Sequence, residues 1–127
     1  MGEVQFAISK VAETGGSLIG HVAISQVKIS DGSDGWFGLG PVSVLPDFQN
    51  RGVGSVLIER ACEAAKGLGA EGCVVLGDPC FYRRFGFRVN NGLIYPAVPR
   101  EYFQVLSFTG RFSQGEVSYH EAFTASS

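Results

Sequence analysis

Histidine and cysteine are scarce in this sequence of 127 residues, and their scarcity argues against two kinds of site. The three cysteines, Cys62, Cys73 and Cys80, are odd in number and contain no Cys-x-x-Cys pair. His21 and His120 are the only imidazoles that could join them as ligands. Zinc sites and disulfide frameworks are built from closely spaced sets of such residues. We therefore expect free thiols, no metal site and no disulfide framework.

Long apolar runs and strong charge are also lacking. No stretch approaches the roughly 20 apolar residues that span a bilayer, and the polar start Met1-Gly2-Glu3 does not resemble a secretory signal. Charged residues make up 17% of the chain and the net charge is −2, so nucleic-acid binding has no support. Hydrophobic residues make up 45%, enough to build a core. We predict a single cytoplasmic domain over residues 1–127, with no membrane or nucleic-acid partner.

Glycine, by contrast, is abundant, and two glycines lie where a strand pattern gives way to a helix pattern. They belong to the segment Gln49 to Ser55, which follows an apolar run and a Pro46-Asp47 turn. The first N–H groups of a helix have no intrahelical partner and carry the positive end of the helix dipole, which suits a pyrophosphate. Gly52 and Gly54 have no Cβ to block its approach and adopt positive φ without strain. We predict an anion site in this segment.

Two common phosphate loops do not fit these residues. A Walker A loop requires Lys followed by Ser or Thr after its last glycine, whereas Gly54 is followed by Ser55 and Val56. A dinucleotide fingerprint requires a third small residue three positions after the second glycine, where this chain has Leu57. Basic residues outnumber acidic ones between Arg51 and Arg88, which suits an anion, although a solvated helix face would give the same balance. A glycine-rich turn before an ordinary helix is the alternative.

Periodicity and turn residues predict the other elements. In order, we expect strands at Val4 to Val11, Leu18 to Ile29 and Trp36 to Leu45, a helix at Val53 to Lys66, a strand at Gly72 to Leu76, a short helix at Cys80 to Phe85, and strands at Phe103 to Phe108 and Glu116 to His120. The first two strands form an antiparallel hairpin. The third and fourth are joined through a helix, so they should be parallel. Glycine and proline in the third strand predict a bulge, or a departure from its neighbour, near Gly40 to Ser43.

Three polar residues have simpler explanations than catalysis. His21 lies within the second strand, where a hydrogen bond in the sheet explains it better than a chemical role does. Asp78 precedes Pro79, which is the pattern of a helix N-cap followed by proline at the first helical position. Cys80 has no histidine near it in sequence, so a small residue at a helix start is a simpler interpretation than a nucleophile.

Two motifs give the chain a family resemblance. Gln49-x-x-Gly52-x-Gly54, between a strand and a helix, resembles the Gln/Arg-x-x-Gly-x-Gly signature of the GCN5-related N-acetyltransferases. Phe81-Tyr82-Arg83-Arg84-Phe85-Gly86-Phe87 resembles the Tyr-x-x-x-Gly-Phe block of the same family, and it follows at the expected place. The run from Pro41 to Phe87 is similar to the YhbS-like branch of that family. The strands before and after this run extend the resemblance over nearly the whole chain.

The resemblance implies a fold and a reaction. The fold is α+β: a mixed, mostly antiparallel sheet with a central, splayed pair of parallel strands and flanking helices. The reaction is N-acetyl transfer from acetyl-CoA, an acyl-CoA cosubstrate, to a small-molecule or peptide amine by direct attack in a ternary complex. Tyr82 would protonate the departing thiolate, although an aromatic packed between helix and sheet is the alternative. By the family pattern, backbone groups that bind the cofactor would come from Val42, Ser43 and Val44 for the pantetheine arm and from Asn50, Arg51, Gly52, Val53, Gly54 and Ser55 for the pyrophosphate.

Two features of the family pattern are missing here. A general base is not evident, because the third strand offers only Ser43. Family members usually carry a strand and one or two helices before the hairpin, whereas this chain begins almost at the hairpin. Either the chain is a short or truncated member with an open acceptor side, or a partner subunit covers that face. Because an apolar sheet face would otherwise be exposed, we expect a homodimer. A CoA-binding module with little or no turnover is the alternative function, and an interaction protein that binds no nucleotide is a third.

Overall fold

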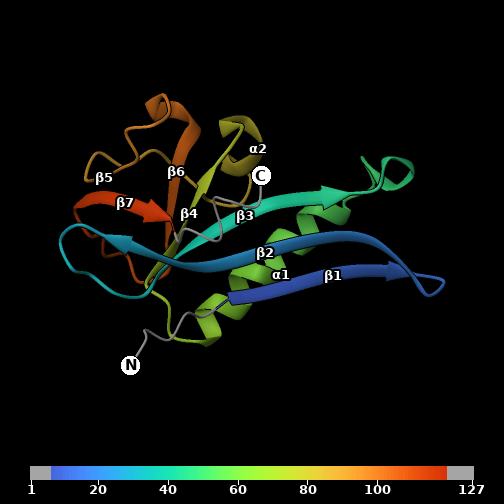
Figure 1. Cartoon of the computed structure of the whole chain (residues 1–127). Helices are drawn as coiled ribbons and strands as arrows, with labels where there is room; N and C mark the ends of the chain where they lie inside the picture. Colours follow the sequence, from blue (N-terminus) through green and yellow to red (C-terminus); the bar gives the residue numbers. More distant parts are fainter. Residues whose placement is uncertain (1–6, 120–127) are drawn as a thin grey trace.

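The computed structural model describes residues 7–119, and within this range the strands form one mixed sheet (Figure 1). The strand order is β5-β7-β2-β3-β4-β6, with β1 paired to β2. The strands are β1 Ala7–Thr14, β2 Ser17–Ile29, β3 Trp36–Val44, β4 Gly72–Leu76, β5 Leu93–Ile94, β6 Phe103–Ser107 and β7 Gly115–Tyr119. The helical elements are the α-helices α1 Val53–Gly67 and α2 Pro79–Arg83 and the 3-10 turns η1 Pro46–Phe48 and η2 Arg100–Tyr102. None of the helices in residues 7–119 has the length and apolarity to cross a bilayer.

The predicted hairpin is confirmed. β1 and β2 pair antiparallel through a tight turn at Gly15 and Gly16, whose φ angles of 57° and 81° favour glycine. The predicted start of the first strand, at Val4, lies outside the described residues, as does His120 at the predicted end of the last strand. β5, a two-residue strand parallel to β7, was not predicted.

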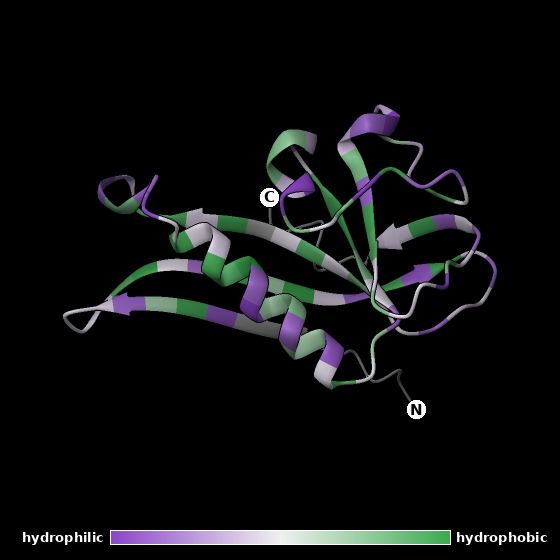
Figure 2. Ribbon diagram, turned by 180° about the vertical axis from the view of Figure 1, so that it is seen from behind, coloured by the Kyte–Doolittle hydropathy of each residue, from purple (hydrophilic) through white to green (hydrophobic). Residues whose placement is uncertain are grey.

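Helix α1 covers one face of the sheet formed by β1, β2 and β3 (Figure 2). Its buried side chains, spaced at helical intervals, are Leu57, Ile58, Ala61 and Ala65. They pack with Val22 and Ile24 of β2 and with Phe37 and Leu39 of β3. Full burial of each large aliphatic side chain contributes about 1.5–3 kcal/mol, so this contact fixes the helix, and therefore its N-terminus, against β3.

A second apolar cluster fills the other face of the sheet, under the C-terminal strands. Trp36, Val74, Leu93, Phe103 and Val117 are among its buried members. The Trp36 indole N–H donates to Ser113 Oγ at 2.9 Å, so its polar atom is satisfied inside the cluster. The two clusters therefore pack against both faces of the sheet where β3 and β4 pair.

β3 and β4 pair in parallel only over their first residues. The pairing runs from Trp36 with Gly72 to Leu39 with Val75 and stops there. β4 then ends at Leu76, while β3 continues along β2 to Val44 and on toward the start of α1 (Figure 1). The register between β2 and β3 shifts in the same region, which confirms the bulge predicted near Gly40 to Ser43. The predicted splayed, parallel strand pair is therefore confirmed.

Candidate functional site

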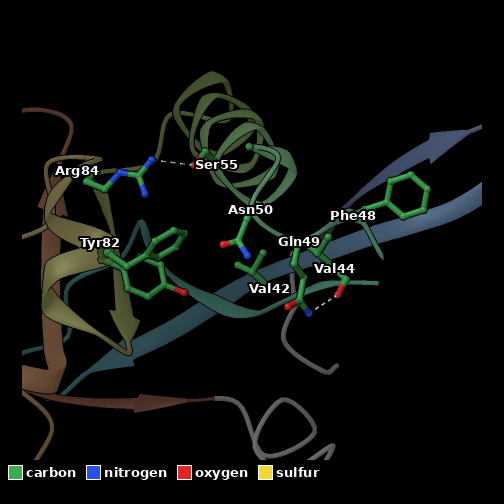
Figure 3. A pocket seen from close by; sticks show the side chains of 11 residues that line it. Val42, Val44, Phe48, Gln49, Asn50, Ser55, Tyr82 and Arg84 are labelled. Carbon is green, nitrogen blue, oxygen red and sulfur yellow. Dashed lines mark hydrogen bonds between the residues drawn. The ribbon is translucent and has the colours of Figure 1, made fainter. Parts of the chain in front are cut away.

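A cavity of about 560 Å³ lies between β3, α1 and α2, where β3 and β4 separate (Figure 3). One wall comes from β3 and the loop after it, and the other comes from α2. Its lining residues are Val42, Val44, Phe48, Gln49, Asn50, Gly52, Gly54, Ser55, Phe81, Tyr82 and Arg84. Both sequence motifs therefore meet at one cavity, although about 25 residues separate them in the chain.

The loop before α1 and the first turn of the helix carry a row of backbone N–H groups without a hydrogen-bond partner within residues 7–119, and four of their residues line this cavity: Asn50, Gly52, Gly54 and Ser55. Gly52, the N-cap, is left-handed at φ 81°, and Asn50 is also left-handed at φ 63°. Asparagine tolerates this conformation better than most residues. The N–H groups of residues 50–55 donate no hydrogen bond within the described part of the chain, and the first helical bond runs from Val56 N to Gly52 O at 3.1 Å. No acidic side chain lies in the first turn, so an anion meets attraction there.

Gln49 fixes this loop to the strand before it. Its Nε2 donates to Val44 O at 3.0 Å, which closes the segment between the end of β3 and the start of α1. The glutamine of the motif thus acts on the backbone at the end of β3. The side chains of Val42 and Val44 form the apolar floor of the cavity, and Gly54 lies against them.

Position 54 holds glycine, although the surrounding protein leaves room for a side chain there. A Cβ built there would lie 3.6 Å from Val42 Cγ1 and 3.8 Å from Val44 Cγ2, which are ordinary contact distances. The φ angle of Gly54 is also not in the left-handed region that favours glycine. Packing therefore does not require glycine at this position, whereas a ligand close to the backbone would.

Tyr82 is packed in the core and also lines the cavity. It is only 8% exposed, and its ring contacts Phe81 and Phe87 edge to face, with ring centroids 5.0 Å and 5.9 Å away. Its hydroxyl nevertheless points into the cavity, toward Val42 (Figure 3). Burial raises the pKa of Tyr82 above its ordinary value, so the phenol keeps its proton well into the alkaline range. The side chain is therefore an aromatic of the core whose hydroxyl faces the cavity, and its role as a proton donor stays a prediction.

The helix that carries Tyr82 starts as predicted. Asp78 is the N-cap of α2, and its Oδ1 accepts a hydrogen bond from Cys80 N at 2.9 Å. The helix begins at Pro79 and ends at Arg83, slightly earlier than the predicted range, and Gly86 follows in a left-handed conformation at φ 98°. Asp78 is therefore engaged in capping, as the sequence indicated.

Arg84 also lines the cavity, and sequence reasoning did not include it in the site. Its Nη2 donates to Ser55 Oγ at 3.4 Å, so it reaches from the end of α2 to the first turn of α1 (Figure 3). Its guanidinium lies over the rings of Phe81 and Phe85, 5.4 Å and 5.7 Å from their centroids. The excess of basic residues between Arg51 and Arg88 was the one available signal, but it did not single out this arginine.

Three of the predicted cofactor-binding residues do not line the cavity with their side chains. Ser43 lies between Val42 and Val44 and is the register partner of His21, on the opposite face of the sheet. The guanidinium of Arg51 lies over the Phe48 ring, 5.5 Å from its centroid. Val53 packs toward Gly20 of β2. For these residues the prediction concerns backbone groups, and it stays a prediction.

Comparison with known proteins identifies the family. A family model described as acetyltransferase (GNAT) domain matches residues 6–89, a range that contains both motifs and both walls of the cavity. The chain belongs to the GNAT family.

Within residues 7–119, no group of three His, Cys, Asp or Glu side chains could hold a metal ion.

Two curated GNAT relatives are named as uncharacterized N-acetyltransferases of Escherichia coli K12. YhbS is 32% identical over 74 residues, which cover 58% of this chain and 44% of YhbS. YjhQ is 31% identical over 102 residues, which cover 76% of this chain and 56% of YjhQ. The chain therefore spans about half the length of the curated relatives it matches.

Two solved GNAT structures resemble the fold over most of this chain. A GNAT family acetyltransferase from Brucella melitensis, in complex with acetyl-CoA, is 47% identical with a TM-score of 0.77, over 91% of this chain and 67% of that one. E. coli YhbS, in complex with CoA, is 31% identical with a TM-score of 0.83, over 91% of this chain and 68% of that one. These likenesses confirm the predicted YhbS-like GNAT fold.

Proposed function

We propose that this GNAT chain is an acyl-CoA-dependent N-acetyltransferase that moves an acetyl group from acetyl-CoA to an amine within a ternary complex. The observation that carries the proposal is the cavity itself. It places the unpaired backbone donors at the head of α1 opposite the hydroxyl of Tyr82, beside a strand edge released from pairing. The solved relatives bound to acetyl-CoA and CoA support the same ligand class here.

The cofactor would be held chiefly by backbone groups. The N–H groups of residues 50–55 would surround the pyrophosphate, and each charge-assisted hydrogen bond contributes about 1.5–3 kcal/mol. The freed edge of β3 at Val42, Ser43 and Val44 would pair with the amides of the pantetheine arm as an added strand does. Arg84 would add a positive charge beside Ser55, at the same anionic end.

Tyr82 would serve as the general acid. As the neutral amine attacks the carbonyl carbon, a C–N bond forms and the C–S bond breaks, and the CoA thiolate takes the phenolic proton. Such a proton donor contributes typically 10²–10⁴-fold to the rate. The raised pKa of Tyr82 supports this role because the phenol remains protonated between turnovers.

Two measurements on the full chain test the proposal. Isothermal calorimetry with acetyl-CoA should give saturable binding. Thiol release from acetyl-CoA should then rise when tyramine, spermidine, L-lysine or a peptide with a free N-terminus is added. Binding without amine-dependent release would favour the CoA-binding module, and no heat at high micromolar acetyl-CoA would exclude both functions.

Arg84 gives a prediction of its own. R84Q should weaken acetyl-CoA binding by about 3- to 10-fold, because one cation near the phosphates is worth up to about 1.4 kcal/mol, the equivalent of tenfold in affinity. The affinity of the variant should also depend less on salt, because one screened attraction is gone. Calorimetry at two salt concentrations measures both effects.

Arg83, the last residue of α2, is the matched control, since it directly precedes Arg84, is exposed as Arg84 is, and does not line the cavity. R83Q should leave the affinity for acetyl-CoA within about twofold, a difference of roughly 0.4 kcal/mol. Equal losses in R83Q and R84Q would mean that only the overall charge of α2 matters, and no loss in R84Q would remove Arg84 from the site.

A further inference from the structure

We propose that His21, acting through Ser43, takes the proton that the acceptor amine must lose before it attacks. This inference rests on the proposed acetyl transfer and supplies the base that the sequence of β3 alone did not reveal. The observation behind it is the register of the sheet, which pairs His21 of β2 with Ser43 of β3 at the splayed segment.

Ser43 faces away from the cavity that would hold the cofactor. Val42 and Val44 point toward Gly54 at the head of α1, and side chains alternate along a strand, so Ser43 points to the opposite face of the sheet. It is exposed there. Because α1, α2 and the loop between β3 and α1 surround the cavity on its own side, the opposite face is the approach left for an amine beside Val42.

His21 lies one strand farther from the cavity on the same face as Ser43. Directly opposed residues of an antiparallel pair have Cβ atoms about 4.5–5.5 Å apart, so the two side chains are neighbours on this face, although they form no hydrogen bond with each other in the structure. His21 is half-buried, and its side chain makes no hydrogen bond within residues 7–119. The hydrogen bond in the sheet that the sequence suggested for this histidine is therefore not present among the described residues.

Within residues 7–119, the strands beside His21 bring little charge to its face of the sheet. Its register partners are Val11 of β1 and Ser43 of β3, neither of which is charged. Lys10 pairs with Val22, so it lies on the side that faces α1, and Glu13 lies beyond the β1 register shift, next to the hairpin turn. α1 packs on the other face of the sheet.

The proton balance closes with these two residues and Tyr82. Ser43 Oγ–H passes its proton to a ring nitrogen of His21 and receives one from the ammonium group, which leaves a neutral amine and an imidazolium. The amine forms the C–N bond, the C–S bond breaks, and the thiolate takes the Tyr82 proton. The attacking nitrogen then loses its second proton, which restores Tyr82 through solvent, and His21 releases its own proton to solvent. One proton is released per acetyl group transferred. In this scheme Ser43 contacts the amine, and His21 acts through it.

The pH dependence of kcat/KM for the most active amine of the panel tests this role. The wild type provides the reference value of kcat/KM at each pH. In H21Q, kcat/KM should fall about 10- to 100-fold at pH 7. This difference between H21Q and the wild type should narrow as the pH approaches the pKa of the free amine, because more of the amine is then neutral without the help of a base. S43A should show the same narrowing. Acetyl-CoA affinity should be unchanged in both variants.

Ser25 provides a control, because it lies on the same face of β2 as His21 and pairs with Gly38 rather than with the splayed residues. S25A should keep the wild-type profile. A deficit in H21Q that is constant at all pH values, or no deficit, overturns the role of His21 while leaving acetyl transfer intact. Acetyl-CoA binding by the wild type without transfer to any amine overturns both proposals.

Discussion

Replacement of Gly54 by glutamate is expected to abolish measurable binding of acetyl-CoA. The new carboxylate would lie among the N–H groups of residues 50–55, where it would occupy the space of the pyrophosphate and repel it. A loss of at least about 100-fold in affinity, or roughly 2.8 kcal/mol, is expected from the bulk and the like charge together. Calorimetry with acetyl-CoA, on protein whose thermal midpoint is checked in parallel, measures the effect.

The structure separates this effect from misfolding. A Cβ at Gly54 meets Val42 and Val44 only at ordinary contact distances, so G54A should fold as the wild type does. Gly67, the last residue of the same helix, has nothing within 4 Å of a built Cβ and lies about 20 Å away along the helix axis. G67E adds the same charge to the same helix and should bind acetyl-CoA normally. Unchanged affinity in G54E would refute the anion site at the head of α1.

The sequence predicted those parts of the site that depend on local chemistry. Gly52 and Gly54 identify the head of a helix, Asp78 identifies the start of the next one, and Gly40 with Pro41 predicts the departure of β3 from its neighbour. Each of these signals operates within a few residues, so it can be read before any tertiary contact is known. The family resemblance added Tyr82, and the structure places its hydroxyl in the same cavity as the glycines.

The remaining parts depend on contacts between distant segments. Arg84 joins the site because α2 packs beside the first turn of α1, and Ser55 lies 29 positions away in the chain. The pairing of His21 with Ser43 depends on the register shift in β3: Leu39 and Val42 both face α1, although a regular strand would place them on opposite faces. Periodicity in the sequence cannot reveal such a shift. The expected homodimer and the cytoplasmic location stay predictions.

Removal of one oxygen atom at Tyr82 should slow turnover without weakening cofactor binding. The phenylalanine of Y82F keeps the contacts with Phe81 and Phe87, so the affinity for acetyl-CoA should stay within about twofold. The rate constant kcat should fall about 100-fold, within the range typical of a lost general acid. Thiol release under saturating amine and acetyl-CoA measures kcat, and calorimetry measures affinity.

The pKa of Tyr82 adds a test by pH. The protonated phenol is the active form, and burial raises its pKa, so wild-type turnover should persist at alkaline pH and decline only above the ordinary tyrosine range near 10. The residual rate of Y82F should lack that decline, because the titrating group is gone. Tyr102, an exposed tyrosine outside the cavity, is the control, and Y102F should keep both the rate and the decline. If Y82F turns over as fast as the wild type, the thiolate takes its proton from another donor and Tyr82 serves only to pack the core.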